Sequence, residues 1–188
     1  MNWPNILTFI RILLIPLFVI AFYLPVQWGH LVAAILFALA AFTDWLDGYL
    51  ARTLKQFTKL GAFLDPVADK LIVSVALILI VAQPIITVHA AVITIPAAII
   101  VAREIIVSAL REWMAELGKR THVAVSYLGK VKTVLQMLAL LVLIYCTNET
   151  NFMLVLAGFA LLYTAAILTI WSMLIYVQLA WKELREMG

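Results

Sequence analysis

The sequence has few charged residues and almost no cysteine. Lys, Arg, Asp and Glu together make up 12% of its 188 residues, about half the share in an ordinary soluble domain. The one cysteine, Cys146, excludes a disulfide framework and a metal cluster built from cysteines. The net charge is only +3, which together with the low charge content excludes a disordered chain and a nucleic-acid binder with a broad basic face.

Apolar residues take the place of the missing charge. They make up 66% of the chain, and the mean hydropathy is +1.11. A soluble domain of this length cannot bury so much apolar surface, because its ratio of surface to volume is too high. We therefore expect lipid to be the solvent for much of the chain.

Six apolar runs are each long enough to approach the ~20 residues that a helix needs to cross a bilayer. Backbone groups in lipid must form hydrogen bonds within their own segment, so the runs should be helices. The connections between them are short and leave no room for a second domain. The sequence therefore predicts an all-α, polytopic membrane protein, a single domain over 1–188, with spans at about 5–24, 31–51, 62–82, 86–110, 130–147 and 152–178.

Basic residues alternate between the connections and predict the orientation. The connections near 25–30, 83–89 and 148–151 contain no Lys or Arg. Cytoplasmic loops carry the excess of Lys and Arg in membrane proteins. We therefore expect six spans with both termini in the cytoplasm. The basic residues lie after the second span (Arg52, Lys55, Lys59), after the fourth (Arg111, Lys119, Arg120, Lys130, Lys132) and in the tail (Lys182, Arg185).

All four aspartates of the chain lie within 26 residues, near the cytoplasmic ends of the second and third predicted helices. Ionisable residues in membrane segments are costly and are usually functional. Asp44 and Asp47 are three residues apart and Asp65 and Asp69 are four apart, so each pair shares a helix face. The two helices should form a hairpin turning near Phe57, which brings both pairs to a similar depth in the membrane.

Four carboxylates in one pocket need compensating positive charge. Two divalent cations would balance them, and oxygen ligands favour Mg²⁺, Mn²⁺ or Ca²⁺ over zinc. Metal pairs held by carboxylates are common in phosphoryl chemistry. The alternative is a set of helix-end aspartates that face cytoplasmic water.

Two segments, DWLDGYLAR at 44–52 and GAFLDPVAD at 61–69, resemble the signature of the CDP-alcohol phosphotransferase family in every fixed position. The similarity continues at 4–11 (PNILTFIR), at 103–104 and 109–112 (RE and ALRE), and at 129–133 (GKVKT). It is closest to the bacterial members that use CDP-diacylglycerol as donor and glycerol 3-phosphate as acceptor. The resemblance thus implies an enzyme of phospholipid biosynthesis, a homodimer in the bacterial cytoplasmic membrane with its site open to the cytoplasm.

The resemblance also implies a chemistry. In this family a hydroxyl attacks the β-phosphorus of a CDP-linked lipid, and CMP leaves. The four aspartates would hold two Mg²⁺ or Mn²⁺ ions, and Asp69 would be the general base on the acceptor hydroxyl. The positions associated with binding of CDP-diacylglycerol are Gly48, Ala51, Arg52 and Gly61.

The acceptor phosphate needs cations of its own, and four basic residues near the cytoplasmic side are candidates: Arg103, Arg111, Lys130 and Lys132. Arg103 could instead neutralise a carboxylate at membrane depth, such as Glu104. Asn5, Thr8 and Arg11 form a polar strip on the first helix. This strip could bind phosphate or support the packing of that helix.

Two alternatives stay open. The first keeps the chemistry and changes the acceptor to inositol phosphate, serine or phosphatidylglycerol. The second is a divalent-cation transporter in which the aspartates form a transit site. A transporter would need polar residues that continue across the bilayer, and the second and third helices are almost purely apolar beyond Asp44 and Asp69.

Overall fold

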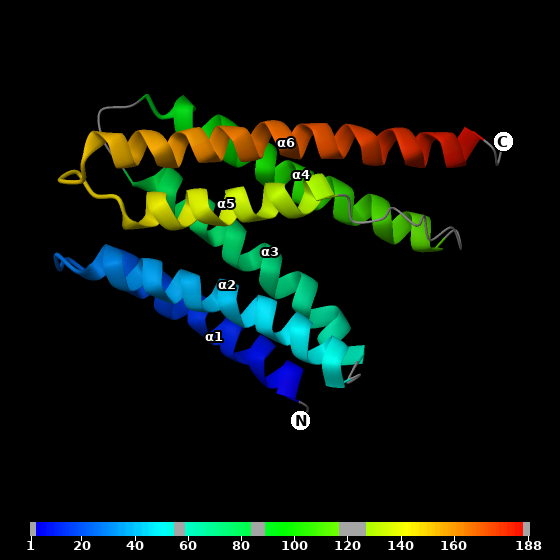
Figure 1. The fold of residues 1–188 in the computed structure, drawn as a ribbon, viewed down its shortest axis with the longest axis horizontal. Coiled ribbons are helices and arrows are strands. Elements are labelled where there is room, and N and C mark those ends of the chain that lie inside the picture. The colour runs from blue at the N-terminus through cyan, green and yellow to red at the C-terminus, as the bar shows by residue number, and fades with distance from the viewer. Residues whose placement is uncertain (1–2, 55–58, 84–88, 117–126, 186–188) are drawn as a thin grey trace. The chain divides into compact units, whose positions relative to one another are not determined.

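The computed structural model describes residues 3–54, 59–83, 89–116 and 127–185, and the regular structure in these ranges is entirely helical (Figure 1). The prediction of an all-α fold is confirmed, because each predicted apolar run coincides with one helix. The helices are α1 (Trp3–Tyr23), α2 (Gly29–Leu54), α3 (Lys59–Ala82), α4 (Ala91–Glu116), α5 (Tyr127–Tyr145) and α6 (Phe152–Arg185).

The largest difference from the predicted boundaries is at the end of α6. The apolar run was expected to end near residue 178, but the helix continues to Arg185. The added residues include Leu, Ala, Lys and Glu, which are good helix formers. The helix therefore continues into the polar tail, where hydropathy alone gives no signal.

Four of the helices contain a segment long and apolar enough to cross a membrane by itself. α3 carries four charged residues in its first half, and only Val131–Tyr145 of α5 is apolar. The structure thus describes a multi-pass membrane protein with four candidate spans among its described residues. These segments are Ile6–Tyr23, Gly29–Leu50, Ala91–Met114 and Phe152–Gln178.

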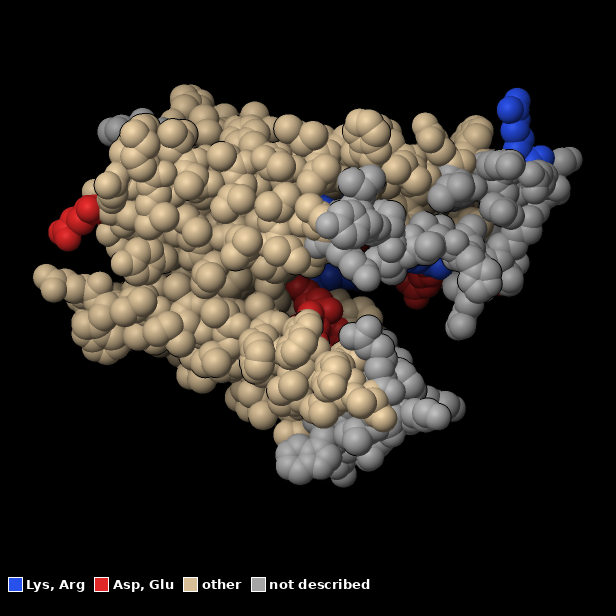
Figure 2. Space-filling model, in the orientation of Figure 1, with Lys and Arg blue, Asp and Glu red and all other residues tan. Residues whose placement is uncertain are grey.

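The outer surface is consistent with a lipid environment. Large apolar side chains are widely exposed, for example Leu13, Phe63 and Met153 at 65%, 67% and 70%. Figure 2 shows how little of one face belongs to charged residues. Contiguous exposed apolar surface on this scale is unfavourable in water, and it is the expected surface of helices that face hydrocarbon.

The chain divides into two compact units, which are described separately. Unit 1 comprises residues 1–88 and 140–156, and unit 2 comprises residues 89–139 and 157–188. In unit 1, α1 and α2 form a closely packed antiparallel pair, and α3 packs against α1 (Figure 1). Ala33 and Ala40 of α2 are fully buried, since small side chains allow helices to approach closely.

The end of unit 1 that lies away from the aspartates has an aromatic core and a histidine network. Phe18 lies 5.9 Å from Phe37 and 6.3 Å from Phe22, measured between ring centroids. His30 of α2 contacts the carbonyl oxygen of Ile144 through Nδ1 and the side-chain amide of Gln83 through Nε2, both at 3.0 Å. This histidine therefore links the start of α2 to the ends of α3 and α5.

Unit 2 contains α4, the first part of α5 and most of α6. Ile100 and Leu162 are fully buried in its core. The hydroxyl of Tyr163 donates to the carbonyl oxygen of Val92 at 3.0 Å, which joins α6 to the start of α4. Four polar side chains are also buried here, from α5 and α6: Lys132, Gln136, Thr169 and Ser172.

Gly29 starts α2 at a point where the chain passes close to the end of α1. A Cβ atom there would lie 2.9 Å from the carbonyl oxygen of Leu24 and 3.0 Å from that of Ala21. We expect Gly29→Ala to cost about 1–3 kcal/mol of stability, because these backbone atoms cannot easily move away. Thermal unfolding of the detergent-purified protein measures the loss. Gln27→Ala, an exposed position in the same turn, is the control, and equal unfolding temperatures for the two variants would contradict the steric argument.

Candidate active site

The four aspartates lie on two helices of unit 1, Asp44 and Asp47 on α2 and Asp65 and Asp69 on α3. Asp47 is buried, with 5% of its side chain exposed. The side chains of Asp44 and Asp69 are 48% and 45% exposed, and Asp65 is half-buried. The group therefore combines one buried carboxylate with three that are accessible to a ligand.

Arg11 of α1 joins these carboxylates. Its side chain is completely buried, and its Nη1 lies 3.1 Å from a carboxylate oxygen of Asp44. The same Nη1 donates to Asp69, and Nη2 donates to Asp47. A buried guanidinium is tolerated only with such opposite charges around it. One side chain of α1 thus fixes the relative position of aspartates on both α2 and α3.

Thr8 lies one helical turn before Arg11 and contacts the remaining aspartate. Its hydroxyl donates to Oδ1 of Asp65 at 2.6 Å, and Thr8 itself is completely buried. The spacing of three residues puts Thr8 and Arg11 on one face of α1. All four aspartates are therefore in contact with this face.

The donor set suits a hard divalent cation, because carboxylate oxygens are the ligands that Mg²⁺ and Mn²⁺ prefer. If all four aspartates are ionised, Arg11 balances only one of their negative charges. Among the described residues, however, no group of three Asp, Glu, His or Cys side chains is arranged to hold one ion. A cation bound by three of these carboxylates would have to share them with Arg11 or displace its guanidinium.

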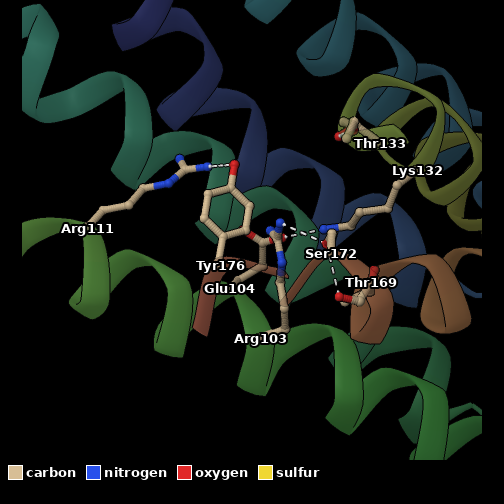
Figure 3. A network of polar contacts seen from close by, with 9 residues as sticks. Arg103, Glu104, Arg111, Lys132, Thr133, Thr169, Ser172 and Tyr176 are labelled. Atoms are coloured by element: carbon tan, nitrogen blue, oxygen red, sulfur yellow. Dashed lines mark hydrogen bonds and ion pairs between the residues drawn. The ribbon is translucent and has the colours of Figure 1, made fainter. Parts of the chain in front are cut away.

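A second charged cluster lies in unit 2, on α4 and α5 (Figure 3). Oε1 of Glu104 accepts hydrogen bonds from Nη1 of Arg103 at 2.7 Å and from Nζ of Lys132 at 3.0 Å. Only 11% of the Arg103 side chain and 2% of the Lys132 side chain are exposed. Nη2 of Arg103 also lies 3.4 Å from the hydroxyl oxygen of Ser172 on α6. Arg103 and Lys132 are therefore brought together by their common contact with Glu104.

Arg111 makes a different contact. Its Nη2 donates to the hydroxyl of Tyr176 at 2.8 Å, and its guanidinium lies 5.0 Å from the centre of that ring. Arg111 is exposed. Of the four cations predicted to hold the acceptor phosphate, the structure therefore joins Arg103 and Lys132 and pairs Arg111 with an aromatic residue instead.

The positions predicted for the CDP-linked donor lie beside the aspartates in sequence. Gly48 is half-buried on α2, and Gly61 is buried on α3. The helices also contain four further predicted positions, but their side chains lie outside the described residues: Asn5, Ala51, Arg52 and Lys130.

Sequence reasoning missed the contribution of α6. Ser172 contacts Arg103, Tyr176 contacts Arg111, and Thr169 is completely buried. The spacing of Thr169, Ser172 and Tyr176 puts these polar groups on one face of an otherwise apolar helix. This pattern could have been found in the sequence, although hydroxyl groups are a weaker signal than charges.

The family model for CDP-alcohol phosphatidyltransferases matches residues 1–171. This range includes the four aspartates and Arg11, and also the charged cluster of Arg103, Glu104 and Lys132. The chain therefore belongs to the CDP-alcohol phosphatidyltransferase family.

Curated relatives are similar over almost their whole length. A protein of Yersinia enterocolitica is 54% identical over 186 residues, which is 99% of this chain and 98% of the relative. A protein of Escherichia coli (strain K12) is 53% identical over 185 residues, 98% of each chain. Both are named CDP-diacylglycerol–glycerol-3-phosphate 3-phosphatidyltransferase.

Substitution of Arg11 should destabilise unit 1. Arg11→Ala would leave a buried carboxylate without its counter-charge, a change that typically costs about 3–5 kcal/mol. Arg11→Lys should cost less, because it keeps the charge but loses the fork of donors. Thermal unfolding compares both with Arg185→Ala, an exposed arginine at the end of α6. An unchanged unfolding temperature for Arg11→Ala would contradict the role assigned to this residue.

Proposed function

We propose that this chain transfers a phosphatidyl group from CDP-diacylglycerol to glycerol 3-phosphate and releases CMP. The observation that carries the proposal is the identity of 54% with a relative of that name over 99% of the chain. The cluster of aspartates around Arg11 supplies the chemistry that such a transfer needs. The product would be phosphatidylglycerophosphate, a precursor of anionic phospholipids.

In the reaction, the acceptor hydroxyl oxygen forms a bond to the β-phosphorus, and the bond from that phosphorus to the CMP oxygen breaks. The hydroxyl proton passes to a carboxylate. Asp69 is the proposed base, and its half-exposed side chain gives the acceptor access. The contact with Arg11 holds this carboxylate in place, so that orientation contributes to the rate along with basicity.

We propose that the four aspartates hold two Mg²⁺ or Mn²⁺ ions, for which the half-exposed Asp44 and Asp69 offer accessible oxygen ligands. When bound, such ions neutralise the diphosphate and the charge that develops on departing CMP. Gly48, Ala51, Arg52 and Gly61 are the proposed contacts for the donor. The two glycines carry no side chain and permit close approach of the nucleotide, and an arginine can bind phosphate with two parallel hydrogen bonds.

The proposed site for the acceptor phosphate is the basic group Arg103, Arg111, Lys130 and Lys132. The triad of Arg103, Lys132 and Glu104 keeps one positive charge in excess after its internal pairing. A phosphate dianion gains charge-assisted hydrogen bonds there, whereas a neutral alcohol gains little. This difference favours glycerol 3-phosphate over plain glycerol.

The enzyme is proposed to cross the bacterial cytoplasmic membrane six times as a homodimer, with both termini and the site on the cytoplasmic side. The alternation of basic and base-free connections supports this orientation. α3 and α5 would then cross the membrane with the help of neighbouring helices, because their charged and polar residues contact other protein groups.

An assay of the purified protein tests the proposed function. The protein is incubated with CDP-diacylglycerol, Mg²⁺ and, in turn, glycerol 3-phosphate, glycerol, serine, inositol phosphate or phosphatidylglycerol, and the lipid product is identified by mass. With glycerol 3-phosphate as acceptor, phosphatidylglycerophosphate should form, and the other acceptors should give no lipid product. A different product, or equal rates with glycerol and glycerol 3-phosphate, would overturn the assignment.

Asp65→Asn should remove turnover while the protein still folds. The amide oxygen can still accept the hydrogen bond from Thr8, but the substitution removes a negative charge from the site. Rates at low Mg²⁺ are measured together with the unfolding temperature, and Glu149→Gln, an exposed carboxylate outside the cluster, is the matched control. Near-parent activity of Asp65→Asn at low Mg²⁺ would exclude Asp65 from the metal site.

Cysteine labelling tests the proposed topology. In a Cys146→Ala background, Asn148→Cys should react with an impermeant maleimide only from the outer face, and Thr53→Cys only from the cytoplasmic face. Both positions are exposed. Intact cells and inverted vesicles present the two faces, and the cysteine-free parent is the control. Labelling of Asn148→Cys from the cytoplasmic side alone would contradict six spans with both termini inside.

A further inference from the structure

Glu104 has an unexpected position for a carboxylate, because it lies within the group of cations proposed to bind an anion. One of its oxygens, Oε1, accepts hydrogen bonds from both Arg103 and Lys132. Through Arg103, the carboxylate is also linked to Ser172 on α6. Glu104 and Arg103 of α4 thus connect to α5 through Lys132 and to α6 through Ser172 (Figure 3).

The two cations need this carboxylate. Lys132 is almost completely buried, and Arg103 is nearly so. Two buried positive charges without a counter-charge would repel each other and would carry the full cost of losing their hydration. Both side chains are also long and have many rotamers, so they would otherwise spread toward solvent.

The triad retains the capacity to bind an anion after this internal pairing. Its sum of charges is one positive charge. Nη1 of Arg103 donates to Glu104 and Nη2 donates to Ser172, while Nε of Arg103 is buried without a hydrogen-bond partner. A buried N–H donor without a partner is costly in a protein, and a phosphate oxygen would satisfy it.

Two neighbouring polar groups are in the same condition. Oγ1 of Thr169 and Oε1 of Gln136 are buried without a partner. Thr169 lies one helical turn from Ser172 on α6, and Gln136 lies one turn from Lys132 on α5. Buried polar groups in native proteins nearly always have partners. The hydroxyl of Thr169 can donate to a bound anion, whereas Oε1 of Gln136 is an acceptor and needs a donor such as water.

We propose that Glu104 is a positioning residue, which holds Arg103 and Lys132 in the arrangement that binds the phosphate monoester of the acceptor. The proposal rests on the proposed function and deepens it by naming what gives the basic group its geometry. Glu104 does not contact the phosphate in this scheme. It acts through the two cations, by fixing their rotamers before the acceptor arrives.

The test uses Glu104→Asp, which keeps the charge and shortens the side chain by one methylene group. We expect the KM for glycerol 3-phosphate to rise about tenfold, since each tenfold step corresponds to roughly the free energy of one well-placed contact. The inhibition constant of inorganic phosphate, which competes with glycerol 3-phosphate, should rise by a similar factor. The KM for CDP-diacylglycerol and the unfolding temperature should stay near the parent values. Glu112→Gln, an exposed carboxylate on the same helix, should match the parent throughout.

Glu104→Gln is a second variant, and it should raise the KM for glycerol 3-phosphate further than Glu104→Asp does. If Glu104→Gln does not fold, the result for Glu104→Asp tests the positioning role by itself. An unchanged acceptor KM in Glu104→Asp, or an equal rise in both KM values, would overturn the positioning role. Failure of the parent to use glycerol 3-phosphate would instead overturn the proposed function. In that case, the positioning role of Glu104 is tested by the rise in unfolding temperature that inorganic phosphate causes. This rise should be smaller in Glu104→Asp than in the parent.

Discussion

A guanidinium buried among carboxylates holds unit 1 together. Arg11 has no exposed surface, so its charge is tolerable only while aspartates surround it. Those aspartates come from α2 and α3, and both helices must therefore pack beside α1 at a fixed rotation and depth. Thr8 adds the remaining aspartate to the same face of α1. The arrangement that stabilises the three helices is thus also the arrangement that assembles the acidic site.

Unit 2 follows the same rule with the signs reversed. Here one carboxylate, that of Glu104, lies between two cations, and the triad keeps a positive charge where the aspartate group keeps a negative one. A group with excess negative charge suits metal cations, and a group with excess positive charge suits a phosphate. A transfer between a diphosphate donor and a phosphorylated acceptor requires both kinds of site. Each unit thereby offers the excess charge that suits one of the two ligand chemistries.

Much of this could be predicted from the sequence, because the signals are strong and local. Apolar runs indicated the helices, and the spacing of the aspartates placed each pair on one helix face. The partners of Arg11 could not be predicted, since they depend on how α1 is rotated against α2 and α3. From the sequence alone, the polar strip of Asn5, Thr8 and Arg11 fits phosphate binding as well as helix packing. The hydroxyl groups of Thr169, Ser172 and Tyr176 share one face of an apolar helix, but they carry no charge and give a weaker signal than the aspartates do. α3 and α5 were expected to span the membrane, although charge in α3 and the short apolar segment of α5 leave them outside the four candidate spans.

The aspartates around Arg11 are proposed to form a site for two divalent cations. Binding of Mn²⁺ to the purified protein, followed by electron paramagnetic resonance, measures this directly and without turnover. The parent should bind two ions per chain, and Asp65→Asn and Asp69→Asn should each bind fewer, while Glu149→Gln should bind as many as the parent. Absence of Mn²⁺ binding by the parent, or full binding by both aspartate variants, would contradict the claim.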